Sequence, residues 1–311
     1  MRSDQSLKGV LLAFLSFAAY SWSDASVKMI EGALTPYEMG FWGAVFMLAG
    51  FPFLLKKDDR WHDAFRSTNR PLWILRFFSA AIGTIGSVAA FTYLSMAEAF
   101  ALIFLLPSFV TIMSVIFLKE TVGIRRWSAV VIGFIGVLVV LRPGFRELSI
   151  GHLGAVFAGL SGAISIVIYR AMGPTEKTIS LYGAGIAGVL VVLGFMMIPD
   201  FRWPTMIEWV MLAGYGLLGA FATIMLMYAA NYAPAAMIGP PQYSQMLWAI
   251  LFGYLIFGDT VDLPMLIGIL LIIGSGLLTL ARERARDVPL PHSVAPDPQA
   301  AAVTIPEKSG P

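Results

Sequence analysis

The length and frequency of its apolar stretches constrain this chain most. Charged residues make up only 13% of its 311 residues, whereas a typical soluble domain carries roughly 25%. A helix that crosses about 30 Å of hydrocarbon needs roughly 20 mostly apolar residues, and about ten such stretches follow one another here. The sequence therefore predicts an all-α polytopic membrane protein with short connections. The predicted transmembrane helices are residues 8–28, 36–55, 72–94, 98–118, 127–141, 151–170, 180–198, 206–229, 235–256 and 263–281.

The Lys and Arg residues predict how these helices are oriented. With ten helices, 17 of the 21 basic residues fall on the side of the two termini, and Lys28, Arg142, Arg146 and Arg202 remain on the other side. Because basic residues concentrate in cytoplasmic connections, both termini are predicted to be cytoplasmic. An odd number of helices would mix the two groups, so the asymmetry also supports the even count. The expected location is a bacterial-type cytoplasmic (inner) membrane.

A weak internal repeat divides the chain into two halves. Each half holds five predicted helices, an odd number, so the halves would have opposite orientations in the membrane. Such inverted repeats are typical of alternating-access transporters. The shared pattern is Gly9, Ala13, Ser23 and Lys28 in the first half, and Gly151, Ala155, Ser165 and Arg170 in the second. The predicted units are residues 1–145, residues 146–286 and a Pro-rich, disordered cytoplasmic tail at 287–311.

Two ionisable residues lie within the first predicted helix. Asp24 and Lys28 are four residues apart, so they share one face of that helix. An ionisable side chain inside a membrane is costly unless it faces a cavity or a partner. Asp24 is therefore predicted to contact a solute or to act as a protonation switch. The alternatives are a structural ion pair between the two residues, or a Lys28 that extends to the membrane surface.

Proline residues interrupt two corresponding helices, the fourth and the ninth. Each lacks an N–H group and leaves a carbonyl unpaired, which a membrane tolerates only against protein or a water-filled cavity. The ninth helix adds polar side chains at this point, which indicates a broken helix beside a solute; the alternative is a kinked packing helix. The predicted substrate-binding residues are Asp24, Gln242, Tyr243 and Gln245, with Tyr93 and Trp22 as stacking partners. The predicted gate or coupling residues are Lys28, Arg76, Pro107, Pro240 and Pro241.

Several motifs resemble those of a known family. In the first half they are Trp73-Ile74-Leu75-Arg76, Phe91-x-Tyr93-Leu94, Phe104-x2-Pro107, Leu118-Lys119-Glu120, Arg125-Arg126-Trp127 and Leu141-Arg142-Pro143-Gly144. The second half has a looser set, Pro241-x-Tyr243, Trp248-Ala249 and Phe257-Gly258-Asp259. Over about residues 8–282, the chain resembles EamA-domain proteins of the drug/metabolite transporter superfamily. The resemblance implies ten helices in two inverted five-helix repeats and the transport of metabolites.

The pair Asp24-x3-Lys28 also resembles a subgroup of that family. Members of the subgroup are linked to uptake of riboflavin or S-adenosylmethionine, so the resemblance implies uptake of a solute of either kind. The chain departs from many members at Trp42, where they have Arg, and no anion-binding Arg is expected there. Export of amino acids or related metabolites is the alternative transport function.

Other classes of function find less support. The chain has no Cys, and its three His are scattered, so we expect no metal, cofactor or thiol chemistry. Glu98 is expected at the solvated start of a helix, and Gly183-x-Gly185-x2-Gly188 lacks the strand that a nucleotide-binding motif requires. A membrane-embedded enzyme would need a cluster of carboxylates or His, which we do not find. A non-transporting scaffold remains the other alternative. The expected partners are a small-molecule solute and the lipid bilayer, without nucleic acid, and the protein is either a monomer or a homodimer.

Overall fold

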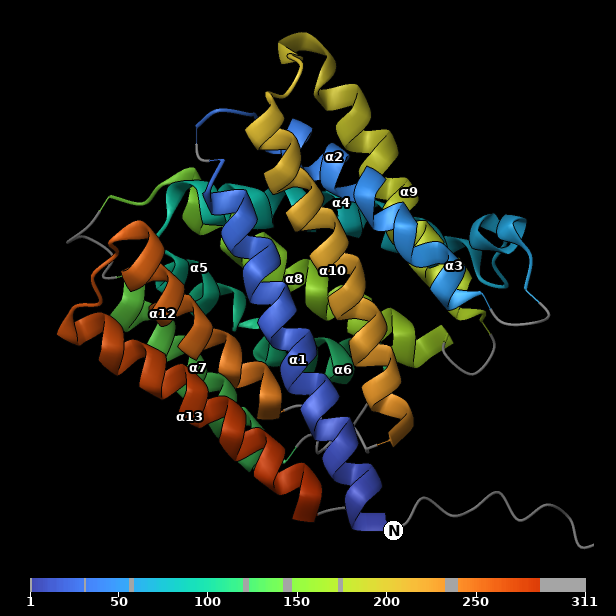
Figure 1. Ribbon diagram of the computed structural model, residues 1–311. Helices are drawn as coiled ribbons and strands as arrows, with labels where there is room; N and C mark the ends of the chain where they lie inside the picture. The colour runs from blue at the N-terminus through green and yellow to red at the C-terminus, as the bar shows by residue number, and fades with distance from the viewer. Residues whose placement is uncertain are drawn as a thin grey trace, which may run out of the picture.

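A computed structural model describes residues 2–30, 32–55, 59–119, 123–141, 147–172, 176–232 and 240–285. These residues form helices and include no strand (Figure 1). The predicted tail at 287–311 lies outside the described residues, as does Glu120. The helices are α1 (Arg2–Lys28), α2 (Pro36–Met47), η1 (Leu48–Gly50), α3 (Phe51–Leu54), η2 (Trp61–Phe65), α4 (Arg70–Tyr93), α5 (Met96–Ile103), α6 (Leu106–Phe117), α7 (Ile124–Leu141), α8 (Ile150–Met172), α9 (Thr178–Met196), η3 (Ile198–Asp200), α10 (Met206–Tyr232), η4 (Pro240–Tyr243), α12 (Ser244–Phe257) and α13 (Leu263–Ala285).

The helices confirm the predicted all-α, multi-pass architecture. Seven helical segments of the described chain are long and apolar enough to cross a membrane. The three other predicted spans, 127–141, 235–256 and 263–281, correspond to α7, to η4 with α12, and to α13, whose described apolar parts are shorter. In Figure 1, the start of α1 and the end of α13 both lie at the lower side of the bundle. We refer to the two ends of the bundle by the ends of α1, as the Arg2 end and the Lys28 end.

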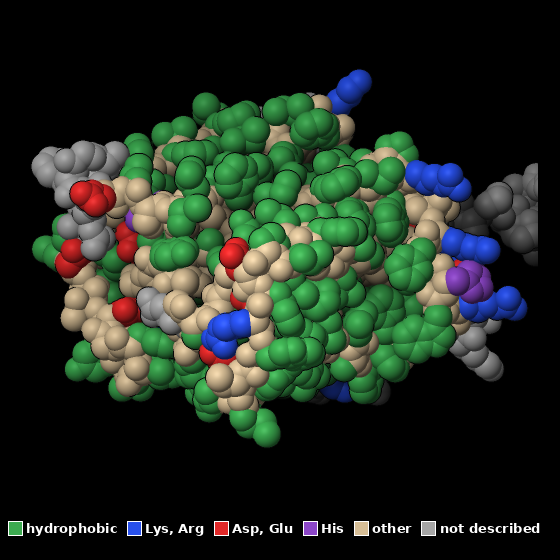
Figure 2. Space-filling model, turned by 90° about the horizontal axis from the view of Figure 1, so that it is seen from above, with side chains coloured by type: hydrophobic (Ala, Val, Ile, Leu, Met, Phe, Trp, Pro, Cys, Tyr) green, Lys and Arg blue, Asp and Glu red, His purple; other side chains and the backbone are tan. Residues whose placement is uncertain are grey.

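The outer surface of the bundle is strongly apolar. Figure 2 shows a face covered mostly by hydrophobic side chains, with several Lys or Arg side chains and a His at its right-hand edge. Large side chains such as Phe53, Phe117 and Tyr254 are 67%, 68% and 69% exposed. A soluble monomer rarely exposes contiguous apolar surface on this scale, whereas lipid chains would cover it favourably.

Local sequence signals fix where several helices begin and end. Thr35 and Glu38 form a reciprocal capping box at the start of α2, with Pro36 in its first turn. The Asn69 side chain accepts a hydrogen bond from the backbone N–H of Leu72 and so caps α4. At the other end of a helix, Gly258 adopts φ +67°, a left-handed conformation that ends α12. The chain can then turn and place the next residue, Asp259, against the bundle.

The fourth predicted span is broken, as its proline indicated. Helix α5 ends at Ile103, and α6 begins at Leu106, so the interruption falls at Phe104 and Leu105. Pro107 lies in the first turn of α6, where its missing N–H costs no helical hydrogen bond. The ninth predicted span likewise contains a short 3₁₀ turn, η4, directly before α12. Both breaks place irregular backbone inside the bundle.

Small residues let helices from the two halves of the chain approach closely. The main packed pairs are α1 with α10, α4 with α8, α4 with α9, and α7 with α13. A Cβ atom added to Gly86 of α4 would overlap the carbonyl oxygen of Gly154 in α8, and one added to Gly188 of α9 would overlap the carbonyl oxygen of Phe77. The glycines that mimic a nucleotide-binding motif are therefore packing residues.

The largest apolar core fills the Lys28 end. Its fully buried side chains include Phe91 at the end of α4, Met96 and Leu102 of α5, and Met246 of α12. Helix α5 packs against both α8 and α12 at this end. The Lys28 end is thus closed by interdigitated side chains, whereas space remains deeper in the bundle.

Candidate functional site

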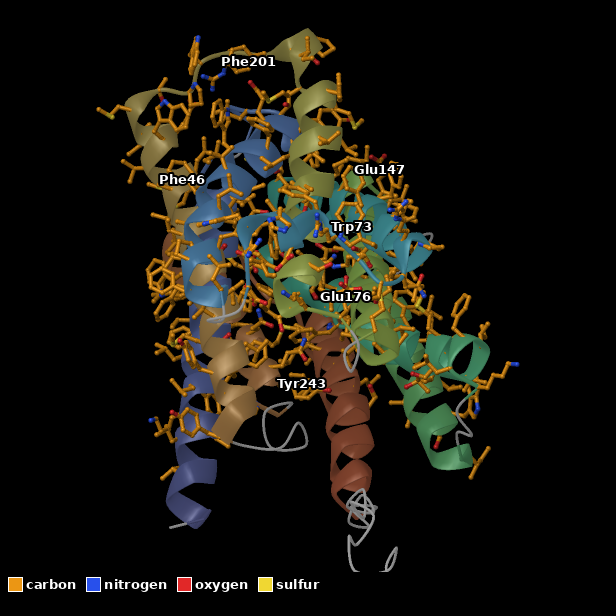
Figure 3. All side chains as sticks on the ribbon, turned by 90° about the vertical axis from the view of Figure 1, so that its right-hand side faces the viewer. Phe46, Trp73, Glu147, Glu176, Phe201 and Tyr243 are labelled. Atoms are coloured by element: carbon orange, nitrogen blue, oxygen red, sulfur yellow. The ribbon has the colours of Figure 1, made fainter. Side chains whose placement is uncertain are left out.

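A cavity of about 820 Å³ lies inside the bundle. Its wall is made by α1, α2, α4, α5, α8, α9, α10 and the η4–α12 segment, so both halves of the chain contribute. It extends from Phe91 and Tyr215, toward the Lys28 end, to Glu176 in the connection before α9. In Figure 3, Glu176 lies near the centre of the view, between Trp73 of α4 and Tyr243 of η4. The volume suits a drug-sized solute, since small-molecule pockets span about 300–1,000 Å³.

Asp24 supplies an acidic side chain to the wall of this cavity. It forms no hydrogen bond or ion pair with any other residue that the structure describes. Two serines of α1 are bonded to α10: Ser16 Oγ donates to the Ala222 carbonyl and Ser23 Oγ to the Tyr215 carbonyl, each at 2.7 Å. These bonds hold α1 against α10 and leave the Asp24 carboxylate available to a solute.

Uncharged polar side chains line the same space from other helices. Gln242 of η4 and Gln245 of α12 lie in the wall, and Gln245 is only 8% exposed. Thr84 and Ser87 of α4 also contribute. Amide and hydroxyl groups of this kind can donate or accept hydrogen bonds, so they can orient a polar solute.

Arg76 and Glu176 are the charged residues of the wall toward the Arg2 end. The Arg76 guanidinium packs on Gly185, where a Cβ would lie 2.8 Å from Nη2. Glu176 accepts hydrogen bonds from Ser67 Oγ at 2.8 Å and from the Thr68 N–H at 2.9 Å. Desolvation by burial raises the pKa of Glu176, but the hydrogen bonds from Thr68 and Ser67 outweigh it and hold the pKa below its ordinary value. Glu176 is thus a satisfied anion that joins two connections at this end.

The structure does not bring all the predicted site residues together. Asp24, Gln242, Gln245 and Arg76 line the cavity, whereas Trp22, Tyr93 and Tyr243 do not. Trp22 and Tyr93 are 43% and 56% exposed, and the Trp22 ring lies 4.5 Å from that of Phe252. The Tyr243 ring packs on Phe104, with 5.9 Å between the ring centres.

The predicted prolines lie at the starts of helices. Pro241 is buried within η4. Pro107 and Pro240 belong to α6 and η4, but their side chains lie outside what the structure describes. Trp42, where no anion-binding Arg was expected, packs edge-on against Trp209, with 4.7 Å between the ring centres.

Lys28 does not line the cavity. It lies at the closed end of the bundle, where it contacts the connections next to α5 and α12. Its Nζ donates to the Leu94 carbonyl at 2.7 Å and lies 3.6 Å from Asp259 Oδ2. The same carboxylate oxygen accepts from the Met96 N–H at 3.1 Å. Lys28 is only 6% exposed, so its charge depends on these acceptors. We call the contacts among Lys28, Leu94, Met96 and Asp259 the Lys28 clamp.

A second polar contact lies at the same end. His152 Nε2 is 3.3 Å from Glu98 Oε1, and the two residues are 9% and 6% exposed. Because the Ser149 N–H donates to His152 Nδ1 at 2.9 Å, the proton of the neutral ring sits on Nε2 and points to Glu98. The expectation that Glu98 is a solvated helix start was wrong: the packing of α5 on α8 buries it. Residue spacing gave no signal for this pair, because its members are 54 positions apart.

These features define a class of protein. Apolar helices enclose a cavity with polar side chains in its wall, to which both halves of the chain contribute, and buried polar contacts lie at one end of the bundle. This is the architecture of a membrane transporter, in which a solute site lies between helices inside the bundle.

Comparison with known proteins identifies the family. The model of the EamA-like transporter family matches residues 7–142 and again residues 148–281. The chain therefore belongs to the EamA-like transporter family, and the predicted family and transport function are confirmed. A solved crystal structure shares the fold, with a TM-score of 0.60 at 18% identity, over 92% of this chain and 100% of that one.

Relatives with assigned substrates are also similar. The S-adenosylmethionine uptake transporter of Rickettsia prowazekii is 24% identical over 280 residues, or 89% of this chain and 94% of that protein. Its counterpart in Rickettsia felis is 26% identical over 286 residues, with the same coverage. The riboflavin transporter of Vibrio cholerae is 27% identical over 190 residues, which cover 60% of this chain and 63% of that protein.

Proposed function

We propose that this protein is a secondary transporter that takes up a small metabolite by alternating access. The bundle would comprise ten transmembrane helices in two inverted repeats, within a bacterial-type inner membrane. The observation that carries the proposal is the cavity of about 820 Å³ whose wall contains the Asp24 carboxylate, which has no partner among the described residues. The solute would bind there, against Asp24, Gln242 and Gln245.

The distribution of basic residues supports a cytoplasmic Arg2 end. The connections at that end carry Arg60, Arg66 and Lys177, and α1 adds Lys8. At the Lys28 end, the described residues supply Lys28 and Arg202. Since basic residues favour the cytoplasmic side, the cavity would extend toward the cytoplasm and the Lys28 clamp would close the outer side. The structure would then correspond to an inward-facing state.

The nature of the solute is proposed from the relatives. The chain is similar over most of its length to proteins named for uptake of S-adenosylmethionine, and over a shorter part to one named for riboflavin. S-adenosylmethionine carries positive charge, which the Asp24 carboxylate would attract, whereas riboflavin would rely on the amides and hydroxyls of the wall. We therefore place an S-adenosylmethionine-like solute first and a riboflavin-like solute second.

Uptake into vesicles tests this function. Reconstituted protein should accumulate radiolabelled S-adenosylmethionine or riboflavin, and Asp24→Asn should lower the uptake rate about tenfold or more, equivalent to about 1.4 kcal/mol of lost interaction. Asp200→Asn is the control, because Asp200 is an exposed carboxylate in the connection between α9 and α10. If neither solute accumulates but preloaded amino acids leave the vesicles, the protein is an exporter of amino acids and not an uptake transporter. No flux of any of these solutes, from protein that is folded, would contradict the proposal.

A further inference from the structure

Asp24 and Lys28 are placed so that they could form an ion pair, but the structure does not pair them. They lie one helical turn apart, with the acid N-terminal to the base, which is the favourable order for such a pair on a helix. Yet Lys28 is bound to the Leu94 carbonyl and Asp259, while Asp24 has no partner among the described residues. The carboxylate in the cavity and the ammonium in the clamp are thus held apart although they could meet.

Opening the Lys28 end would remove the acceptors that Lys28 now has. Leu94 precedes α5, and Asp259 follows α12, so both belong to segments that must separate from α1 before a solute can enter from this side. A buried ammonium cannot be left without acceptors at acceptable cost. The Lys side chain is a long, flexible stem, so its charged end can change partner without movement of the helix. Asp24 is the carboxylate that lies within its reach on α1.

We propose that Lys28 exchanges Asp259 for Asp24 when the Lys28 end opens. In the open state the Lys28 ammonium is then paired with the Asp24 carboxylate in the cavity wall. A solute with a positive charge displaces Lys28 from Asp24, and the released ammonium returns to Leu94 and Asp259 and closes that end behind the solute. This inference rests on the proposed function of the cavity as the solute site. It adds that a positively charged group of the solute binds next to Asp24.

Labelling of a single cysteine tests the exchange without any solute. The chain has no Cys, so Ser87→Cys in the cavity wall gives one thiol. A membrane-impermeant thiol reagent added from the Lys28 side reaches it only while that end is open. Asp259→Asn should raise the labelling rate about fivefold or more, the size of a typical coupling between sites, because the clamp loses an acceptor. Asp24→Asn should lower the rate about as much, because the open state loses the new partner of Lys28.

The deciding comparison is Asp24→Asn with Lys28 replaced. In the Lys28→Met background, Asp24→Asn should leave the labelling rate unchanged, since no ammonium remains to change partner. An equal effect of Asp24→Asn with and without Lys28 would overturn the proposal. This comparison does not require a stable Asp259 variant. Glu98→Gln is the control, because it removes the negative charge from the neighbouring contact with His152 without releasing Lys28; its effect on labelling should be independent of Asp24.

Binding of S-adenosylmethionine, which carries positive charge, and of riboflavin, which does not, gives a second readout. Asp259→Asn should weaken binding of S-adenosylmethionine about fivefold or more, because the freed Lys28 competes for Asp24, and adding Lys28→Met should restore it. Binding of riboflavin should not follow this pattern. Weakened binding that Lys28→Met fails to restore would contradict the exchange. If neither compound binds, the proposed uptake function fails, while the labelling result still decides the role of Lys28.

Discussion

At the scale of single residues, the buried polar groups differ in how their hydrogen bonds are satisfied. Some are satisfied by a partner from a distant part of the chain, such as Ser23 with the Tyr215 carbonyl, whereas others, such as Ser21, bond within their own helix. Asp24 is different, because no described residue pairs with it although it lies inside the bundle. Because an ionisable group inside a membrane protein is costly without a partner, we propose a functional role for Asp24 and not for the polar residues that are satisfied by hydrogen bonds.

Glycines at helix contacts give a prediction at this scale. Gly86→Ala should destabilise the protein by about 1–3 kcal/mol, because the added Cβ overlaps the Gly154 carbonyl oxygen and forces α4 away from α8. Gly274→Ala is the matched control, since a Cβ there meets no atom within 4 Å, and better helix propensity should leave stability unchanged or slightly higher. Thermal unfolding in detergent measures both. Equal unfolding temperatures for the two variants would show that the contact tolerates the methyl group.

At the scale of elements, connections are tied together by exposed ion pairs. Lys177, before α9, lies 2.6 Å from Asp63 of η2 and 3.1 Å from Asp59. The hydrogen bond from Lys177 lowers the pKa of Asp63 to about 2, and the hydrogen bond to Asp63 raises the pKa of Lys177 above its ordinary value. These contacts join the connection before α4 to the start of α9, next to the part of the cavity that Glu176 lines.

The direction of these shifts predicts how the contact responds to pH. The Asp63 contribution is present above its ordinary pKa of 3.8 and disappears as the pH falls through about 2. The Lys177 contribution is present below its ordinary pKa of 10.5 and disappears as the pH rises through the raised value. The difference in unfolding temperature between the wild type and Lys177→Met should therefore be constant between about pH 5 and pH 9. It should shrink as the pH falls from about 4 to 2. A difference that is independent of pH would contradict the ion pair.

The sequence predicted the elements better than their contacts. Helices such as α4 and α9 follow from hydropathy, because each is a local apolar stretch of about membrane length, and Pro107 indicated the break between α5 and α6 to within two residues. Asp24, Gln242 and Gln245 were predicted as site residues because polar side chains are conspicuous in apolar helices, and all three line the cavity. The sequence did not predict the partners across the bundle. The pairing of Glu98 with His152, and of Lys28 with Asp259, depends on which helices pack together, and no local pattern encodes that.

At the scale of the whole molecule, the two ends of the bundle differ, because one end is closed by packing and the cavity extends toward the other. The largest apolar core and both buried polar contacts lie at the Lys28 end, whereas the cavity extends toward the connection that contains Glu176. The orientation proposed from the basic residues makes this arrangement inward-facing.

Single cysteines in the Cys-free chain test that orientation. Arg66→Cys, in the exposed connection before α4, should react with an impermeant reagent only from the cytoplasmic side. Asp200→Cys, between α9 and α10, should react only from the outer side. Intact cells and inverted vesicles provide the two sides. Reaction of both cysteines from one side would contradict the proposed arrangement of the helices between them.

The pairing of α1 with α10 has a consequence for the two sequence halves. Ser16 and Ser23 bond α1 to the backbone of α10, Tyr20 adds a 2.8 Å hydrogen bond to Thr223, and α4 packs on α8 and α9. If the protein changes conformation, we therefore expect the units that stay together to combine helices from both halves. If the chain were cut between α7 and α8, the largest contacts of each fragment would be with the other fragment. The two fragments would therefore have to be made in the same cell to assemble.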